Sequence, residues 1–188
     1  AAREVRLVEL LYPAEELLRV NVVDTPGLNS MVDAHEATAR DYMGQADAVI
    51  WLFSAGQAGK QTEQQALELL RLHRLKTVGV LNKIDRLDAD ELTRVMAHLQ
   101  GEFAELVEAV VPVSARRALD ALTADQQAAQ ELAASRFTEL RGFLEQQLFA
   151  RSRRIKRESC GRRLADVLVE ARDRLEQALG RGDATMAH

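Results

Sequence analysis

The chain has 188 residues, of which 47% are hydrophobic and 29% charged, so it has the composition of a folded globular protein and not of a disordered one. Its formal net charge of −4 gives no field that would attract nucleic acid to the whole molecule, and DNA is not expected as a partner. A single cysteine, Cys160, excludes an internal disulfide and fits a reducing cytoplasm, and no apolar run approaches the roughly 18 residues of a membrane span.

The first half of the chain alternates between strand and helix patterns. The chain starts with alanine and enters a strand pattern almost at once, so we expect it to be cut from within a larger domain. Helices are predicted over 62–75, with Thr62 as the cap, and over 90–109. Strands are predicted over 4–10, 17–24, 47–53, 77–82 and 110–114. This alternation indicates βαβ units, an α/β fold and a mainly parallel sheet flanked by helices.

The second half predicts helices only, over 116–133, over 136–149 behind a cap at Ser135, and over about 152–180. The last of these helices starts with a basic cluster, which places a domain boundary near Arg151. Residues 1–150 are then the α/β domain, and residues 151–188 a basic amphipathic helix and a tail. One face of this helix carries Ile155, Leu164, Leu168, Ala171, Leu175 and Leu179.

That apolar face has two interpretations. It packs against its own domain or against a helical bundle, or its basic first turns contact anionic lipid or nucleic acid. The face holds leucine and alanine and lacks interfacial aromatic residues, which favours packing.

Three short polar strings follow predicted strands, where ligands of parallel sheets bind. The first is Asp24-Thr25-Pro26-Gly27. Asp24 offers a hard oxygen that can hold Mg²⁺ through water, and Gly27 lacks a Cβ, so its amide can approach a phosphate closely. An ordinary turn after a strand would explain the same residues, so the string indicates a site only together with the two strings that follow.

The second and third strings are Asn82-Lys83-Ile84-Asp85 and Ser114-Ala115. Asp85 can accept two hydrogen bonds from the N1–H and amino group of guanine, a pair that adenine does not offer. Asn82 can tie neighbouring loops to the base, the Lys83 stem can lie across its ring, and the Ala115 amide can reach guanine O6. Three such strings in this order predict a guanine-nucleotide site.

The phosphate-binding loop Gly-x-x-x-x-Gly-Lys-Ser/Thr is missing from these 188 residues. Gly59-Lys60 does not supply it, because Ser54 stands where the first glycine belongs and Gln61 follows the lysine. The segment around Gly59-Lys60 is expected to be a surface loop. No histidine has a neighbouring ligand pattern, and no catalytic residue can be assigned.

These strings resemble the third, fourth and fifth motifs of the GTPase superfamily that runs from Ras-like proteins to dynamins, over about residues 4–150. The finer pattern, DTPGLNS followed by ADAVIWLFSAGQAGKQTEQQAL and a basic helix, is similar to bacterial dynamin-like proteins. The resemblance implies a Mg²⁺·GTP site in which Asp24 binds the metal through water and the Gly27 amide senses the γ-phosphate, with Thr25 and Pro26 also among the nucleotide-binding residues. Asn82, Lys83, Asp85, Ser114 and Ala115 would hold the base.

The same resemblance implies more about the whole protein. It implies a switch segment over 28–37, a homodimer of GTPase domains, a stalk bundle that starts with the last helix, and membrane remodelling by a cytoplasmic protein that contacts the inner membrane face. It also implies the strand order 2-3-1-4-5-6, in which the central strand 1 precedes the phosphate loop and is absent here. We therefore expect weak GTP binding and negligible hydrolysis by this chain alone. Two alternatives are an Era-like GTPase of ribosome assembly and a non-catalytic scaffold derived from a GTPase domain.

Overall fold

The structure is a computed structural model that describes residues 8–25, 45–56, 61–72, 74–124 and 128–186. At its centre lies a parallel sheet of β1 (Ala48–Ser54), β2 (Lys76–Asn82) and β3 (Val110–Pro112), in that order. These strands are the predicted strands 47–53, 77–82 and 110–114, and their order is the 4-5-6 part of the expected sheet. The predicted α/β fold with a parallel sheet flanked by helices is confirmed.

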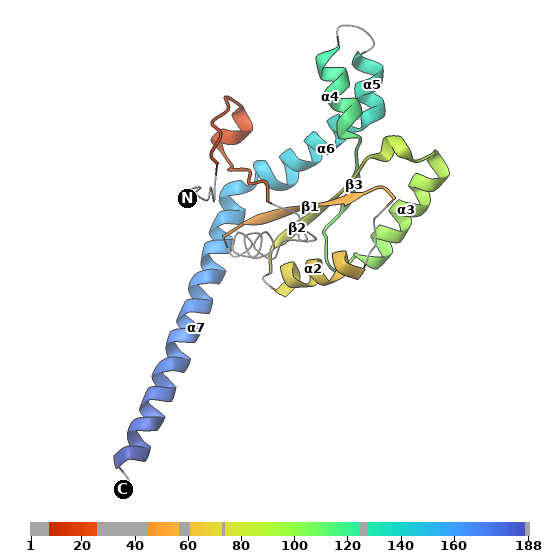
Figure 1. Ribbon diagram of the computed structural model, residues 1–188. Helices are drawn as coiled ribbons and strands as arrows, with labels where there is room; N and C mark the ends of the chain where they lie inside the picture. Colours follow the sequence, from red (N-terminus) through yellow and green to blue (C-terminus); the bar gives the residue numbers. More distant parts are fainter. Residues whose placement is uncertain (1–7, 26–44, 57–60, 73, 125–127, 187–188) are drawn as a thin grey trace, which may run out of the picture.

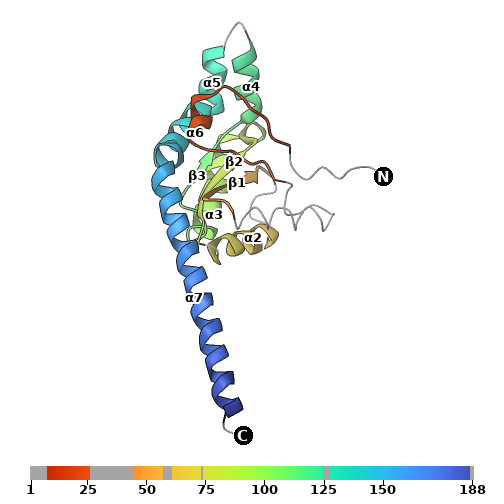
Figure 2. The ribbon, with the colours of Figure 1, turned by 90° about the vertical axis from the view of Figure 1, so that its left-hand side faces the viewer.

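Helices cover both faces of the sheet (Figures 1 and 2). One face packs against α2 (Gln61–Leu72) and α3 (Ala89–Glu102), and the other against α6 (Phe137–Leu144), the π-helical turn η3 (Glu145–Phe149) and the start of α7 (Ser152–Met186). The first core contains the fully buried Phe53, Leu67, Leu70, Leu99 and Phe103. The other face carries two smaller clusters, one of Val78, Leu148 and Ile155 and one of Val80, Val113 and Leu140. Alternate residues of β2 therefore enter different cores, as expected for a strand buried on both faces.

The predicted strands 4–10 and 17–24 are wrong where the structure describes them. Residues 8–25 contain no strand, and Glu15–Leu18 forms the 3-10 turn η1. Ion pairs tie this turn to the α6–η3 segment, between Arg19 and Glu145 at 2.7 Å and between Glu16 and Arg141 at 2.9 Å. A strand needs a neighbour for its backbone hydrogen bonds, and the neighbour expected here, strand 1, is the one that the sequence lacks.

The β1 edge of the sheet also lacks a second neighbouring strand in the described part of the chain. Among the described residues β1 pairs only with β2. Ile50 and Leu52 point to the face that α6 and α7 cover over β2, yet they are 38% and 64% exposed. An apolar strand edge of this kind is a site where further chain can add.

The helices depart from prediction mainly at their ends. α3 begins with a capping box of Asp88 and Glu91 and ends at Glu102, so the predicted helix 90–109 is too long. Its continuation fails because Phe103 and Val107 turn into the core. The predicted helix 116–133 is two helices, α4 (Ala115–Thr123) and α5 (Ala128–Ser135).

The predicted caps also need correction. α2 begins at Gln61, so Thr62 lies inside the helix and is not its cap. Ser135 is the last residue of α5 and is buried, and its Oγ accepts a hydrogen bond from the Phe137 amide at 3.1 Å. Arg136, with φ of +56°, makes the corner between α5 and α6. The predicted helix 136–149 is α6 followed by η3.

α7 starts on the sheet and then leaves it (Figure 1). Arg163 Nη2 donates to the carbonyls of Gln45 and Ala46 at 2.9 Å and to Asp47 Oδ1 at 3.2 Å, and Lys156 lies 3.8 Å from the other oxygen of Asp47. Beyond this attachment the helix projects away from the body as a single rod (Figure 2). In the part of the chain that the structure describes, no helix is long and apolar enough to span a bilayer.

Candidate functional site

The ends of β2 and β3 are held side by side by backbone hydrogen bonds. The Val113 amide donates to Leu81 O at 2.8 Å, and the Ile84 amide donates to Val113 O at 3.4 Å. Directly after β2, Lys83 adopts a left-handed conformation (φ +68°) that turns the chain into η2 (Ile84–Arg86). The buried Ile84 side chain anchors this turn, which leaves Asn82 and Asp85 at the carboxyl edge of the sheet.

The Asn82 side chain joins the two strand ends. Its Oδ1 accepts hydrogen bonds from the Lys83 amide at 2.7 Å and from the Ala115 amide at 3.1 Å. Sequence reasoning placed the Ala115 amide toward guanine O6, and here that amide is bonded to Asn82. A base that takes this amide must therefore displace the Asn82 oxygen.

Ser114 connects the other half of the site. Its hydroxyl, on a fully buried residue, donates to Asp85 Oδ1 at 2.6 Å and accepts from the Arg117 amide at 3.2 Å, which makes Ser114 the N-cap of α4. One oxygen atom thus fixes both the first turn of α4 and the Asp85 carboxylate. The sequence predicted Ser114 as a nucleotide-binding residue. In the structure its hydroxyl is hydrogen-bonded to Asp85.

The environment of Asp85 favours its ionised form. The Ser114 hydrogen bond is the largest cause that lowers the pKa of this carboxyl below its usual value, followed by a backbone hydrogen bond and the charges of Arg117 and Arg86, while burial acts the other way. At neutral pH Asp85 is therefore ionised and can only accept hydrogen bonds, which suits a ligand that presents donors.

Of the first string, the structure describes only Asp24 and Thr25. Asp24 and Thr25 are exposed and belong to no regular element, and Pro26 and Gly27 lie outside the described residues. No hydrogen bond or ion pair between described residues links Asp24 or Thr25 to Asn82, Asp85 or Ser114. The described residues also contain no group of three or more metal-ligating side chains, so Mg²⁺ binding through Asp24 stays a prediction.

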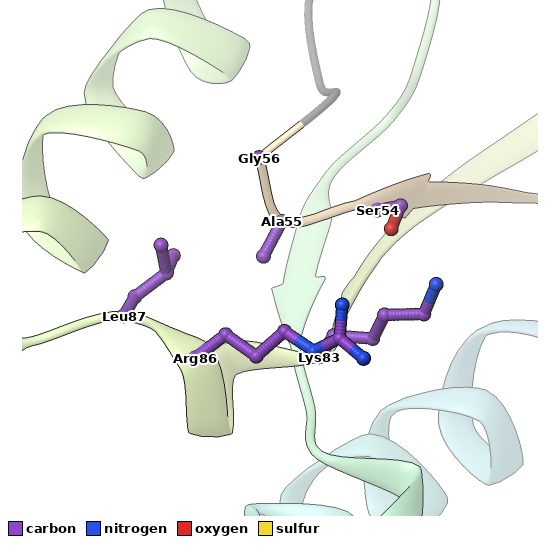
Figure 3. Close-up of a pocket in the computed structure, with 6 residues that line it drawn as sticks. All are labelled: Ser54, Ala55, Gly56, Lys83, Arg86 and Leu87. Carbon is purple, nitrogen blue, oxygen red and sulfur yellow. The ribbon is translucent and has the colours of Figure 1, made fainter.

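A pocket of about 440 Å³ opens at the ends of β1 and β2, between Ser54, Ala55 and Gly56 on one side and Lys83, Arg86 and Leu87 on the other (Figure 3). Its two cationic side chains, Lys83 and Arg86, favour an anionic ligand. Sequence reasoning missed Arg86 and Ser54. The only signal was their position, since Arg86 directly follows Asp85 and Ser54 ends an apolar run that leads to this edge.

Comparison with known proteins decides the family. Residues 4–172 match the family model described as the elongation factor Tu GTP binding domain. The chain belongs to this family. The predicted membership of the GTPase superfamily is thereby confirmed, and guanine-nucleotide binding is the function of the family.

The relatives of this GTP-binding domain include proteins with dynamin-like names. Dynamin-like protein 2 of Campylobacter jejuni is 29% identical over 63% of this chain and 19% of its own length. The probable transmembrane GTPase FZO-like, chloroplastic, of Arabidopsis thaliana is 31% identical over 58% of this chain and 12% of its own. Isoniazid-induced protein IniC of Mycobacterium tuberculosis is 31% identical over 71% of this chain and 31% of its own length. No solved structure matches significantly.

The chain thus spans less than a third of the length of these relatives. The names of the first two relatives, a dynamin-like protein and an FZO-like GTPase, agree with the predicted resemblance to dynamin-like GTPases and with the prediction of a GTPase domain.

Proposed function

We propose that this chain forms the base-recognising part of a dynamin-like GTPase domain, with guanine bound at Asn82, Lys83, Asp85, Ser114 and Ala115. The observation that carries the proposal is the position of the Asp85 carboxylate, which accepts a hydrogen bond from the Ser114 hydroxyl at 2.6 Å beside the Asn82–Ala115 hydrogen bond. An acceptor-only carboxylate matches the two adjacent donors on the Watson–Crick edge of guanine, and adenine offers no such pair.

Base binding then exchanges two hydrogen bonds. The Ala115 amide leaves Asn82 Oδ1 and donates to guanine O6, and the Asn82 side chain turns to the base. The exposed Lys83 stem covers a ring face, and Lys83 and Arg86 supply positive charge at the pocket where phosphates approach.

The phosphate side of the site is incomplete in these 188 residues. Asp24, Thr25, Pro26 and Gly27 are proposed to contact Mg²⁺ and the γ-phosphate, but the sequence has no Gly-x-x-x-x-Gly-Lys-Ser/Thr loop. GTP is therefore bound mainly through its base, and hydrolysis by the chain alone is negligible. The catalytic lysine and metal-binding hydroxyl would come from a longer form of the protein.

For the whole protein, the proposal is GTP hydrolysis coupled to membrane remodelling, with a homodimer of GTPase domains and a cytoplasmic location at the membrane surface. The relatives named Dynamin-like protein 2 and transmembrane GTPase FZO-like support its GTPase part. In this proposal residues 1–150 are the partial GTPase domain and residues 151–188 begin a helical extension. An RNA-binding domain in a longer form would instead favour ribosome assembly, and a longer form without the phosphate loop would favour a scaffold.

The test is nucleotide preference of the Asp85→Asn variant. An amide presents one acceptor and one donor, which fits the N1–H and C2 carbonyl of xanthine better than guanine. We expect GDP affinity to fall about 100- to 1,000-fold and the preference to move toward xanthosine diphosphate. Titration of the 188-residue chain with fluorescent GDP, xanthosine diphosphate and ADP measures this.

Asp90→Asn is the matched control, because Asp90 is an exposed carboxylate in the first turn of α3 and lies outside the site. It should leave the preference unchanged. Equal affinity of the unsubstituted chain for GDP and ADP would contradict the proposal. GTP turnover above that of a heat-denatured sample would contradict the expected inactivity of the chain alone.

A further inference from the structure

The pocket at the ends of β1 and β2 adjoins the cluster of Asn82, Asp85 and Ser114. Ser54, the last residue of β1, pairs in register with Asn82, the last residue of β2, and the Ala55 amide donates to Asn82 O at 3.0 Å. The cluster lies on the β3 side of the corner at Asn82, and the pocket lies on its β1 side. Because neighbouring strands are only about 4.8 Å apart, the two sites are neighbours.

The turn η2 directs Asp85 and Arg86 to different sides of this corner. Successive side chains of a 3-10 turn point about 120° apart, because the turn has three residues. Asp85 accordingly reaches Ser114 after β3, whereas Arg86 lines the pocket beside residues 54–56 after β1. One short turn thus presents a carboxylate to one site and a guanidinium group to the other.

The polar groups of the pocket lie together. In Figure 3 the charged ends of Arg86 and Lys83 are turned toward the side that carries Ser54, and Leu87 lies on the opposite side. The Ser54 hydroxyl can donate a hydrogen bond on that side. Two cations and a hydroxyl at one side of a cavity suit an anion with several acceptor oxygens.

Both cations are available to such an anion. Among the described residues, no ion pair or side-chain hydrogen bond involves the Lys83 ammonium group or the Arg86 guanidinium group. The acids of this region have other partners, since Asp85 is hydrogen-bonded on the β3 side and Asp88 and Glu91 form the capping box of α3. No acidic residue lines the described pocket.

We propose that Arg86 binds the diphosphate of a guanine nucleotide in this pocket, with Lys83 and Ser54 beside it. The inference rests on the proposed guanine site and goes beyond it, because it gives the chain a phosphate contact that does not use the missing Gly-x-x-x-x-Gly-Lys-Ser/Thr loop. The planar fork of the guanidinium group matches two phosphate oxygens. Arg86 therefore makes the chain prefer nucleotides to nucleosides.

The test is titration of the 188-residue chain with guanosine and GDP, without Mg²⁺, which would neutralise the phosphates. We expect GDP to bind about 10-fold more tightly than guanosine. In Arg86→Gln this advantage should disappear while the affinity for guanosine stays that of the parent. GDP that binds no more tightly than guanosine, or an advantage that survives in Arg86→Gln, would overturn the inference.

Arg94→Gln is the matched control, because Arg94 is an exposed arginine of α3 outside the pocket and its loss removes the same charge. It should keep the advantage of GDP. Arg86→Lys keeps the charge and loses the fork, so it should recover part of the advantage. Arg86 is exposed, and Arg86→Gln should unfold at the same urea concentration as the parent.

Ionic strength gives a second readout that a purely structural role of Arg86 would not change. Salt screens the exposed charges that hold the diphosphate and acts little on hydrogen bonds to the base. Raising NaCl from about 50 to about 300 mM should therefore weaken GDP binding by the parent more than GDP binding by Arg86→Gln. Equal salt dependence of the two chains would contradict the contact.

Failure of the proposed guanine site gives a different pattern. In that case guanosine binds no better than adenosine, but ADP still binds more tightly than adenosine, and Arg86→Gln removes the difference. The two substitutions also separate the sites. Asp85→Asn should change the preferred base and keep the advantage of a diphosphate over its nucleoside, whereas Arg86→Gln should do the reverse. A chain that binds neither GDP nor ADP would overturn both proposals.

Discussion

Ser114 makes two hydrogen bonds that hold the candidate site together. Its hydroxyl accepts a hydrogen bond from the Arg117 amide, which caps α4, and donates a hydrogen bond to Asp85, 29 positions earlier in the chain. The same hydroxyl thus orients the start of a helix and favours the ionised form of the Asp85 carboxyl. Substitution at this position therefore affects a structural contact and a ligand-binding group together.

We expect Ser114→Ala to raise the pKa of Asp85 and to lower stability. Loss of the cap costs about 0.5–2 kcal/mol at any pH. The pKa of Asp85 is lower in the folded protein, so its ionised form adds stability above the ordinary carboxyl pKa of about 3.9, and this part is lost as the pH falls through the folded pKa. The difference in free energy of unfolding between parent and variant should therefore be larger at pH 7 than at pH 3.

Urea denaturation at both pH values measures this difference. The control is the same substitution in an Asp85→Ala background, where the effect of Ser114→Ala should no longer depend on pH. A difference between parent and variant that is equal at pH 7 and pH 3 would show that the hydrogen bond to Asp85 does not contribute.

The sequence was sufficient to predict that Asn82, Asp85, Ser114 and Ala115 lie together, because the two strings that contain them follow apolar runs and parallel strands end at one edge. It did not show that the Ala115 amide bonds to Asn82, nor that Arg86 lines the neighbouring pocket. Both depend on the left-handed turn at Lys83, which the residue type does not specify.

At the scale of the elements, β2 is held tightly between its neighbours. A Cβ at Gly79 would lie 3.0 Å from Phe53 Cε2, 3.1 Å from Val110 Cγ2 and 3.2 Å from the Ala109 carbonyl oxygen. The glycine thus allows β1 and β3 to approach the middle strand of the sheet.

We expect Gly79→Ala to destabilise the fold by about 1–3 kcal/mol, because the Phe53 and Val110 side chains must move in a packed core. Gly142→Ala is the matched control: it lies within α6 with no atom near its Cβ position, and helix propensity predicts a gain of about 0.5–1 kcal/mol. Thermal and chemical unfolding of both variants measures the changes. Similar effects of the two substitutions would contradict this account of the β1–β2–β3 packing.

The strands that were predicted wrongly also have an explanation at this scale. Periodicity reports the preference of a segment, but a strand exists only with a neighbour. The apolar runs at 47–53, 77–82 and 110–114 pair as neighbouring strands of one sheet, whereas residues 17–24 have no strand 1 to pair with. The predicted length of the helix 90–109 was wrong for a similar reason, because Phe103 and Val107 pack into the core and α3 ends at Glu102.

At the scale of the whole molecule, exposed apolar residues gather in the first segment and at the β1 edge, and include Val8, Leu10, Leu11, Tyr12, Val22, Ile50 and Leu52. Exposed apolar surface beside an unpaired strand promotes association between molecules.

We therefore expect Leu52→Lys to reduce aggregation of the chain, because a charge at an exposed strand edge opposes pairing. Static light scattering during incubation at high concentration measures this. Leu175→Lys serves as a comparison, because it adds the same charge at an exposed position of α7 and leaves the sheet edge unchanged. An unchanged aggregation rate in Leu52→Lys would show that the β1 edge is not the surface that associates.

The attachment of α7 at Asp47 has a consequence for motion. Arg163 and Lys156 both bind this carboxylate, which is partly exposed, and each such pair contributes less than about 1 kcal/mol. The helix beyond Arg163 extends about 35 Å to Met186. A tilt of about 10° at the attachment would displace the far end by about 6 Å, so a small change of angle at Asp47 would give a large displacement at Met186.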